Sequence, residues 1–235
     1  MQLTRDSWSE DSYGEFVNYL QSLSDKKYKE FSDGLVPDAE FSFGVRVPLL
    51  RSAAKEIVKG NYEEFLNCKI GAYREEIMMQ GLVMSLVKCD YPQMLTYMKR
   101  YAKMIKSWET CDIVSFKGVK KHISEFWNDV EYFIHSTNPW EVRFGFLHLM
   151  GFYLTDEYID DVLSYVNEIN SDFYYVQMMQ AWLVATAAAK QRDKTIAFLA
   201  DNRLNAKTQN MAIQKMRDSY RISPEDKELV KKFKK

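Results

Sequence analysis

Apolar side chains recur at helical spacing along nearly the whole chain. The segment 173–189, FYYVQMMQAWLVATAAA, is apolar on all sides, as expected of a helix packed between neighbours. No stretch alternates apolar and polar residues for long enough to predict a strand. The pattern therefore predicts an all-α protein. The two clearest one-faced runs, with steps of three and four residues, are Val119, Ile123, Phe126, Trp127, Val130, Phe133 and Ile134, and then Tyr158, Ile159, Val162, Leu163, Val166 and Ile169.

Prolines and capping residues mark where several helices begin. Pro48, Pro92 and Pro139 each open a helical run and suit its first turn, where a missing N–H costs nothing. Ser223-Pro224-Glu225-Asp226 adds a capping hydroxyl and acidic residues beside the positive end of the helix dipole. Thr155-Asp156-Glu157 predicts another start. In total the sequence predicts about twelve helices, most of them about 10–17 residues long.

The predicted helices group into pairs. The pairs begin near residues 48, 91, 138, 172 and 207. The intervals between these starts, roughly 35–45 residues, are typical of HEAT and armadillo repeats, in which two helices form one unit. We therefore expect residues 1–235 to form a single domain, a right-handed α-solenoid of such pairs whose concave face is the binding surface. An irregular helical bundle is the alternative.

The composition excludes several classes of protein. With 9 Gly and 5 Pro and 46% hydrophobic residues, the chain is neither disordered nor all-β. No apolar run approaches the ~18–20 residues of a membrane helix, and the N-terminus is polar and acidic, so we expect a cytoplasmic protein that binds no membrane. The 3 Cys form no CxxC pair and the 3 His lack ligand spacing, which argues against a metal site. Common nucleotide-binding and serine-hydrolase motifs are also missing, and we expect no cofactor.

The near-neutral net charge hides two basic stretches. Residues 203–235 hold ten Lys and Arg against four Asp and Glu, and residues 97–122 are also rich in lysine. Separated basic patches of this kind can neutralise the phosphates of a duplex. A solvated tail is the alternative interpretation of the terminal KKFKK. The candidate DNA-binding residues in the two stretches are Lys117, Lys120, Lys121, Lys207 and Lys215.

Four residues whose side chains could take part in binding or catalysis lie in apolar helices. Arg143 lies in NPWEVRFGFLHLMGFYL, where burial without a partner would be costly. Asp112 follows Trp108 by four residues, which places the carboxylate and the indole on one side of a helix. Trp182 lies in the middle of the apolar segment 173–189. These residues form a candidate site, although tryptophans on helices are usually core residues and an Arg–Asp pair is often structural.

The chain contains five segments in this order: GVRVPLLRSAAKEI (44–57), SWETCD, WEVRFGF, YYVQMMQAWLVA (174–185) and NMAIQKMRDSYRIS (210–223). Together they resemble the AlkD-like family of bacterial DNA alkylation repair proteins. The resemblance covers roughly residues 40–225 and implies an all-α superhelix of HEAT-like repeats. It also places the family's Trp-x-x-x-Asp motif on Trp108 and Asp112, its central arginine on Arg143 and its second tryptophan on Trp182.

The resemblance implies a DNA glycosylase that removes cationic alkylpurines, such as 7-methylguanine and 3-methyladenine, from duplex DNA without flipping the base into a pocket. In that case Asp112 would stabilise the cationic sugar and hold water, with Trp108 and Trp182 beside the sugar. Arg143 would bind the phosphate next to the lesion or orient Asp112. We expect the protein to act as a monomer. A non-catalytic HEAT-like module, binding DNA or a protein partner, is the alternative.

Overall fold

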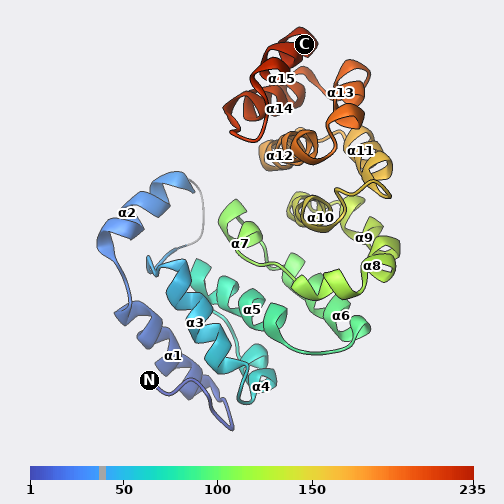
Figure 1. Ribbon diagram of the computed structural model, residues 1–235. Helices are drawn as coiled ribbons and strands as arrows, with labels where there is room; N and C mark the ends of the chain where they lie inside the picture. The colour runs from blue at the N-terminus through green and yellow to red at the C-terminus, as the bar shows by residue number, and fades with distance from the viewer. Residues whose placement is uncertain (37–40) are drawn as a thin grey trace. The chain divides into compact units, whose positions relative to one another are not determined.

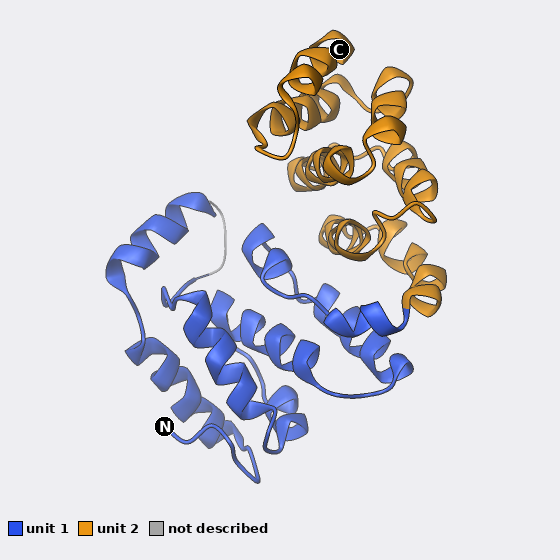
Figure 2. Cartoon of the chain, viewed as in Figure 1, with its two compact units in different colours: residues 1–122 blue, residues 123–235 orange. Residues whose placement is uncertain are grey.

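The structure is a computed structural model that describes residues 1–36 and 41–235. In this part of the chain the secondary structure is helical, apart from an isolated β-bridge between Phe41 and Tyr73. The prediction of an all-α protein is therefore confirmed. The chain divides into two compact units, Met1–His122 and Ile123–Lys235 (Figure 2).

The first unit packs its helices around α5, which is buried on nearly all sides (Figure 1). Helix α5 contacts α3, α6 and α7, and the close approach to α6 requires Gly81. A Cβ atom at Gly81 would lie 2.3 Å from the ring of Tyr101. The elements of this unit are α1 (Glu10–Ser22), α2 (Lys26–Leu35), α3 (Val47–Ile57), α4 (Tyr62–Asn67), α5 (Arg74–Leu86), α6 (Tyr91–Ala102), α7 (Trp108–Asp112) and the 3-10 helix η1 (Lys117–Lys121).

Two buried carboxylates at the start of α5 order the loops around it. Glu75 accepts hydrogen bonds from the backbone N–H groups of Phe43, Gly44 and Val45, at 2.8–3.1 Å. Gly44 has a positive φ of 80°, which an L side chain rarely adopts. The neighbouring Glu76 accepts from the N–H of Gly71 at 2.8 Å. These charges are stabilised because backbone dipoles replace the water that burial removes.

The second unit is organised around α12, which packs between α10 and α14 (Figure 1). Its interior is rich in phenylalanine, including Phe126, Phe133 and Phe144, which are fully buried. The elements are α8 (Ile123–Asp129), α9 (Glu131–Ile134), α10 (Pro139–Phe152), α11 (Ile159–Glu168), α12 (Tyr174–Lys190), α13 (Arg192–Ala200), α14 (Ala206–Asp218), α15 (Pro224–Leu229) and the 3-10 helix η2 (Val230–Phe233).

Buried glutamines join consecutive helices in both units. In the second unit, Gln180 of α12 donates to the carbonyl oxygens of Val166 and Ile169 at the end of α11, at 3.1 and 2.7 Å. Gln209 of α14 donates in the same way to Leu199 of α13, at 3.2 Å. In the first unit, Gln80 of α5 donates to Phe65 of α4, at 3.4 Å. Each acceptor carbonyl lies at the end of a helix, where the regular intrahelical hydrogen bonds run out.

Most predicted helix starts agree with the structure. Prolines 48, 92 and 139 lie in the first turns of α3, α6 and α10, and the Ser223 hydroxyl accepts from the N–H of Asp226 at the start of α15. The start predicted at Thr155 is wrong by four residues. Residues 155–158 form a hydrogen-bonded turn, and the regular helix α11 begins at Ile159.

The single helix predicted over residues 119–134 is also wrong. The backbone leaves the helical region at His122 (φ −135°, ψ 42°), where η1 ends, and a second interruption at Val130 separates α8 from α9. Apolar spacing continued across both breaks, so periodicity alone did not reveal them.

The terminal KKFKK segment is not a free tail. It includes the end of η2, and Gln209 donates to the carbonyl of Phe233 at 2.6 Å. The ammonium of Lys235 donates to the carbonyl of Leu204 at 2.7 Å. The segment is therefore held against the second unit, while its lysine side chains are exposed to solvent, as the solvated-tail interpretation expects. In the described residues, no helix combines the length and apolar character needed to cross a bilayer.

Candidate functional site

The short helix α7 carries two of the predicted site residues, Trp108 and Asp112, in the first unit. It begins with a capping box, in which the Ser107 hydroxyl accepts from the N–H of Thr110 at 3.2 Å. A helix of five residues is not stable alone, so its position depends on tertiary contacts. One of these contacts is buried: the hydroxyl of Tyr101 in α6 donates to the carbonyl of Thr110 at 2.5 Å.

The indole of Trp108 is fixed by a hydrogen bond. Its Nε1–H donates to the carbonyl of Leu35 at the end of α2, at 3.2 Å. Both Trp108 and Asp112 are half-buried, whereas Thr110 and Cys111 between them are fully buried. The helix thus turns its inner side to the core and leaves an indole and a carboxylate partly accessible on the other side.

A buried guanidinium holds the start of α7 against α2 and α5. Arg74 is 3% exposed, and it pairs with Asp33 at 2.5 Å and with Glu109 at 3.3 Å. The Ser32 hydroxyl also donates to Glu109, at 3.3 Å. Burial raises the pKa of Glu109, against the attraction of the Arg74 charge. Partial burial acts to raise the pKa of Asp33. Hydrogen bonds from Lys29 and Ser42 outweigh this effect and hold that pKa below its ordinary value.

Arg143 lies in the second unit, on α10. Its residue surface is 3% exposed, and Nη1 donates to the carbonyl of Tyr175 at 2.7 Å. The ring of Tyr175 also stacks on Trp140, with centroids 5.1 Å apart and an interplanar angle of 29°. These contacts join the first turn of α10 to the first turn of α12.

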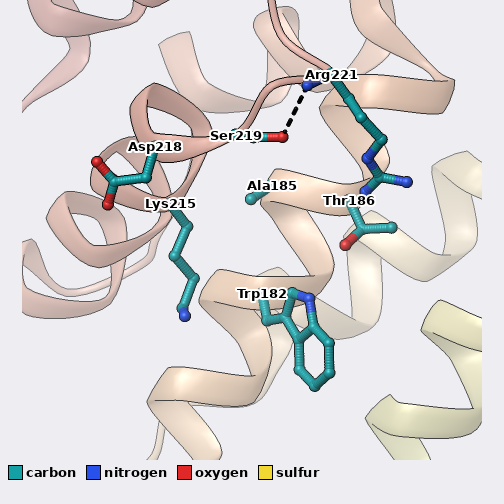
Figure 3. A pocket seen from close by; sticks show the side chains of 7 residues that line it. All are labelled: Trp182, Ala185, Thr186, Lys215, Asp218, Ser219 and Arg221. Atoms are coloured by element: carbon teal, nitrogen blue, oxygen red, sulfur yellow. Dashed lines mark hydrogen bonds between the residues drawn. The ribbon is translucent and has the colours of Figure 1, made fainter.

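Trp182 lies on the exposed side of α12. Its neighbours Ala181 and Leu183 are fully buried, whereas Trp182 is 39% exposed. It lines an open pocket of about 280 Å³ together with Lys215 of α14 and with Arg221 in the turn that follows (Figure 3). The turn is held by the Ser219 hydroxyl, which accepts from the backbone N–H of Arg221 at 3.2 Å. The pocket thus combines an accessible indole with two cations and the carboxylate of Asp218.

The predicted DNA-binding lysines lie on two short surfaces, one in each unit. Lys117, Lys120 and Lys121 are all on η1 and exposed. Lys207 is exposed in the first turn of α14, with its ammonium 5.3 Å from the ring centroid of Tyr174. Lys215 is half-buried beside Trp182.

The structure brings Trp108 and Asp112 together on α7, in the first unit. Arg143 and Trp182 belong to the second unit, on α10 and α12. The convergence of all four on one surface, and the role of each, stay predictions. Among the described residues, no group of three His, Cys, Asp or Glu side chains is placed to hold a metal ion.

Sequence reasoning missed Arg74 and Arg221. Arg221 lies in the basic stretch 203–235, but nothing in the sequence places it beside Trp182. A signal for Arg74 was present, because Arg74-Glu75-Glu76 is a run of three charges at the start of an otherwise apolar helix.

The fold and these surfaces define an all-helical protein with partly exposed tryptophans beside a carboxylate on one helix and beside cations on another. A profile of the DNA alkylation repair enzyme family matches residues 17–221. The chain belongs to this family, which supports a role in DNA repair. No curated protein matches the chain.

Proposed function

We propose that the protein is a DNA glycosylase that hydrolyses the N-glycosidic bond of cationic alkylpurines in duplex DNA. The observation that carries the proposal is the display of Trp108 and Asp112 on one short helix, in a chain whose family is described as a DNA alkylation repair enzyme. Substrates of this kind include 7-methylguanine and 3-methyladenine.

The chemistry of these lesions explains why a carboxylate suffices. Alkylation at N7 or N3 leaves the purine positively charged. When the bond from C1′ to the base breaks, its electron pair goes to the base, which departs neutral and needs no general acid. The sugar becomes an oxocarbenium-like cation, to which a water molecule adds at C1′ while losing a proton. Asp112 offsets the charge of that cation and accepts the water proton.

The tryptophans and the arginine have supporting roles in this proposal. The faces of Trp108 and Trp182 attract a nearby cation and pack on the deoxyribose. Because the Trp108 indole is tied to the Leu35 carbonyl, its ring is oriented before DNA arrives. Arg143, fixed to the Tyr175 carbonyl through one nitrogen, binds the phosphate beside the lesion or orients Asp112. The base is not flipped into a pocket.

We further infer that the helix pairs are HEAT-like repeats of one right-handed solenoid, whose concave face brings the four residues together. The recurring glutamine contact supports this inference. Gln80, Gln180 and Gln209 each donate to a carbonyl at the end of the helix that comes directly before their own in the chain. Such a repeated contact is expected when units share one architecture.

In the same proposal, Lys117, Lys120 and Lys121 of the first unit, with Lys207 and Lys215 of the second, neutralise backbone phosphates. Such contacts release counterions, so affinity for duplex DNA falls steeply as salt rises. Charge reversal at Lys120 and Lys121 should weaken binding with little regard to sequence, because phosphate contacts carry no base readout.

The proposal is tested by incubating the protein with a duplex that carries a single 7-methylguanine and scoring abasic sites by alkaline strand cleavage. We expect strand cleavage at the lesion, with EDTA having no effect, and no release of uracil from a matched duplex, since uracil leaves as an anion. DNA binding without abasic sites would instead support the non-catalytic module. Efficient release of uracil would show the mechanism to be wrong.

A further inference from the structure

A second basic surface lies in the first unit, at a pocket between α3, α5 and the segment that precedes η1. The pocket is open and has a volume of about 310 Å³. Three cations line it, Arg51 and Lys55 from α3 and Lys117 from η1. Its apolar side chains are those of Leu82, Leu86 and Ile113, and Leu86 is 38% exposed.

These cations gather without carboxylate partners. No acidic residue lines the pocket, and within the described residues neither Lys55 nor Lys117 forms an ion pair. One guanidinium nitrogen of Arg51 donates a hydrogen bond to the carbonyl of Ile113, at 3.3 Å. By contrast, Lys29 and Lys59 of the same unit each lie 2.6 Å from a carboxylate oxygen. Like charges held near one another repel, and an anion bound between them would relieve that repulsion. The pocket therefore suits an anionic ligand.

The basic surface continues beyond this pocket. A neighbouring open pocket, of about 670 Å³, shares Lys117 and adds Lys88 and Lys121. Its one carboxylate, Asp90, is engaged as the N-cap of α6, where it accepts from the N–H of Gln93 at 3.1 Å. A row of cations drawn from three segments fits a chain of phosphates better than one small anion.

The apolar side of the first pocket further limits which class of anionic ligand would fit it. Phosphate alone gains nothing from contact with leucine. A nucleotide unit carries a sugar next to its phosphate, and contacts with both groups position a protein on nucleic acid without reading its sequence. The exposed side chain of Leu86 gives the sugar an apolar surface beside the cations.

We propose that the pocket formed by Arg51, Lys55 and Lys117 with Leu86 is a backbone subsite for duplex DNA, which takes one phosphodiester and the sugar attached to it. The identity of the ligand as DNA rests on the proposed function. The subsite lies apart from the lysines that the sequence singled out, except for Lys117, and it extends the DNA contacts of the first unit to α3.

The test is the salt dependence of binding to an undamaged duplex, measured by fluorescence anisotropy. The variant Arg51→Gln/Lys55→Gln is compared with the control Lys59→Gln/Lys69→Gln, which removes the same charge from exposed positions that line neither pocket. We expect the pocket variant to bind more weakly and to reduce the magnitude of the slope of log K against log salt by about 1, as for the loss of one phosphate contact. The control should keep the slope of the unmodified protein.

Two further measurements keep the result interpretable. The conservative variant Arg51→Lys/Lys55→Arg should retain the slope, and thermal unfolding should show that all the variants are folded. Equal slopes for the pocket variant and the control would overturn the proposal, as would an unmodified protein that does not bind duplex DNA. Because an undamaged duplex is used, failure to release bases would refute the glycosylase proposal alone and leave this test standing.

Discussion

The two units hold their tryptophans in different ways. In the first unit, Trp108 begins a helix of five residues and is fixed by polar contacts, its own to Leu35 and that of the adjacent Glu109 to Arg74. In the second unit, Trp182 lies in the middle of a 17-residue helix and is flanked by fully buried Ala181 and Leu183.

Because of this difference, we expect substitutions to affect the two surfaces in different ways. A five-residue helix has little stability of its own, so the geometry around Trp108 and Asp112 depends on a few hydrogen bonds and charges. A long buried helix is positioned by many apolar contacts, so a change at its exposed position should leave it in place. We therefore expect polar substitutions to disrupt the first unit, and substitutions at Trp182 to alter the surface without altering the fold.

The largest effect on stability is expected from Arg74→Met. The substitution leaves Glu109 and Asp33 without their buried cation, which costs about 3–5 kcal/mol when one partner of a buried pair is removed. Arg46→Met is the matched control, because Arg46 pairs with Asp25 at 2.8 Å but its side chain is 57% exposed. That control should cost less than about 1 kcal/mol. Urea unfolding measures both values, and equal losses would contradict the importance of the buried network.

In the second unit the expected sensitivity is to acid. Burial lowers the pKa of His148 from 6.5 to about 4, although a hydrogen bond with the carbonyl of Phe144 opposes the shift. The unfolded chain takes up a proton near pH 6.5, whereas the folded protein does so only near pH 4. The contribution of His148 to stability is thus complete above about pH 6.5 and is lost as the pH falls toward 4. The loss is about 2 kcal/mol at pH 5 and approaches about 3 kcal/mol at pH 4.

In the first unit, the contribution of Asp33 should be lost at a lower pH. The pKa of Asp33 is lowered from 3.8, so its contribution is present above that value and is lost as the pH falls through the lowered pKa. The contribution of His148 is separated from that of Asp33 by measuring urea unfolding at pH 7 and pH 5, because the pKa of Asp33 lies below this range. The measurement compares the unmodified protein with His148→Gln. We expect the stability of the unmodified protein to fall more. An NMR titration of the His148 imidazole near pH 6.5 would contradict this account.

A small effect on stability is expected from Trp182→Ala. Alanine is a good helix former and the side chain is partly exposed, so unfolding free energy should change by less than about 1 kcal/mol. Base release should nevertheless fall about tenfold, because loss of an aromatic contact with the nucleotide costs about 1–3 kcal/mol. Tyr220→Ala provides a control, as this tyrosine is fully exposed and does not line the pocket. Equal effects of the two substitutions on base release would remove Trp182 from the site.

The sequence predicted much of the fold because local rules govern it. Helix starts at Pro48, Pro92, Pro139 and Ser223 follow from backbone chemistry within a few residues, and the burial of α12 follows from its composition. The break at His122 was missed because apolar spacing continues through it, whereas the break itself is a change in the backbone dihedral angles of one residue.

The candidate site was predictable only in part. The spacing of Trp108 and Asp112 places them on one helix, and the resemblance selects Arg143 and Trp182. No local pattern pairs Arg74 with Glu109, since 34 residues separate them in the chain. The same holds for Lys55 and Lys117, which line one pocket although they are far apart in sequence. Such pairings are determined by tertiary packing.

The central claim is that the charge of Asp112 stabilises the transition state of base release. Asp112→Asn keeps the size of the side chain and removes its charge, and Asp11→Asn, at an exposed position of α1, is the matched control. Single-turnover release of 7-methylguanine from a duplex should fall by about 10²–10⁴-fold in Asp112→Asn, with an unchanged unfolding midpoint, and should stay at the unmodified rate in the control. Equal rates for Asp112→Asn and the unmodified protein would contradict the account.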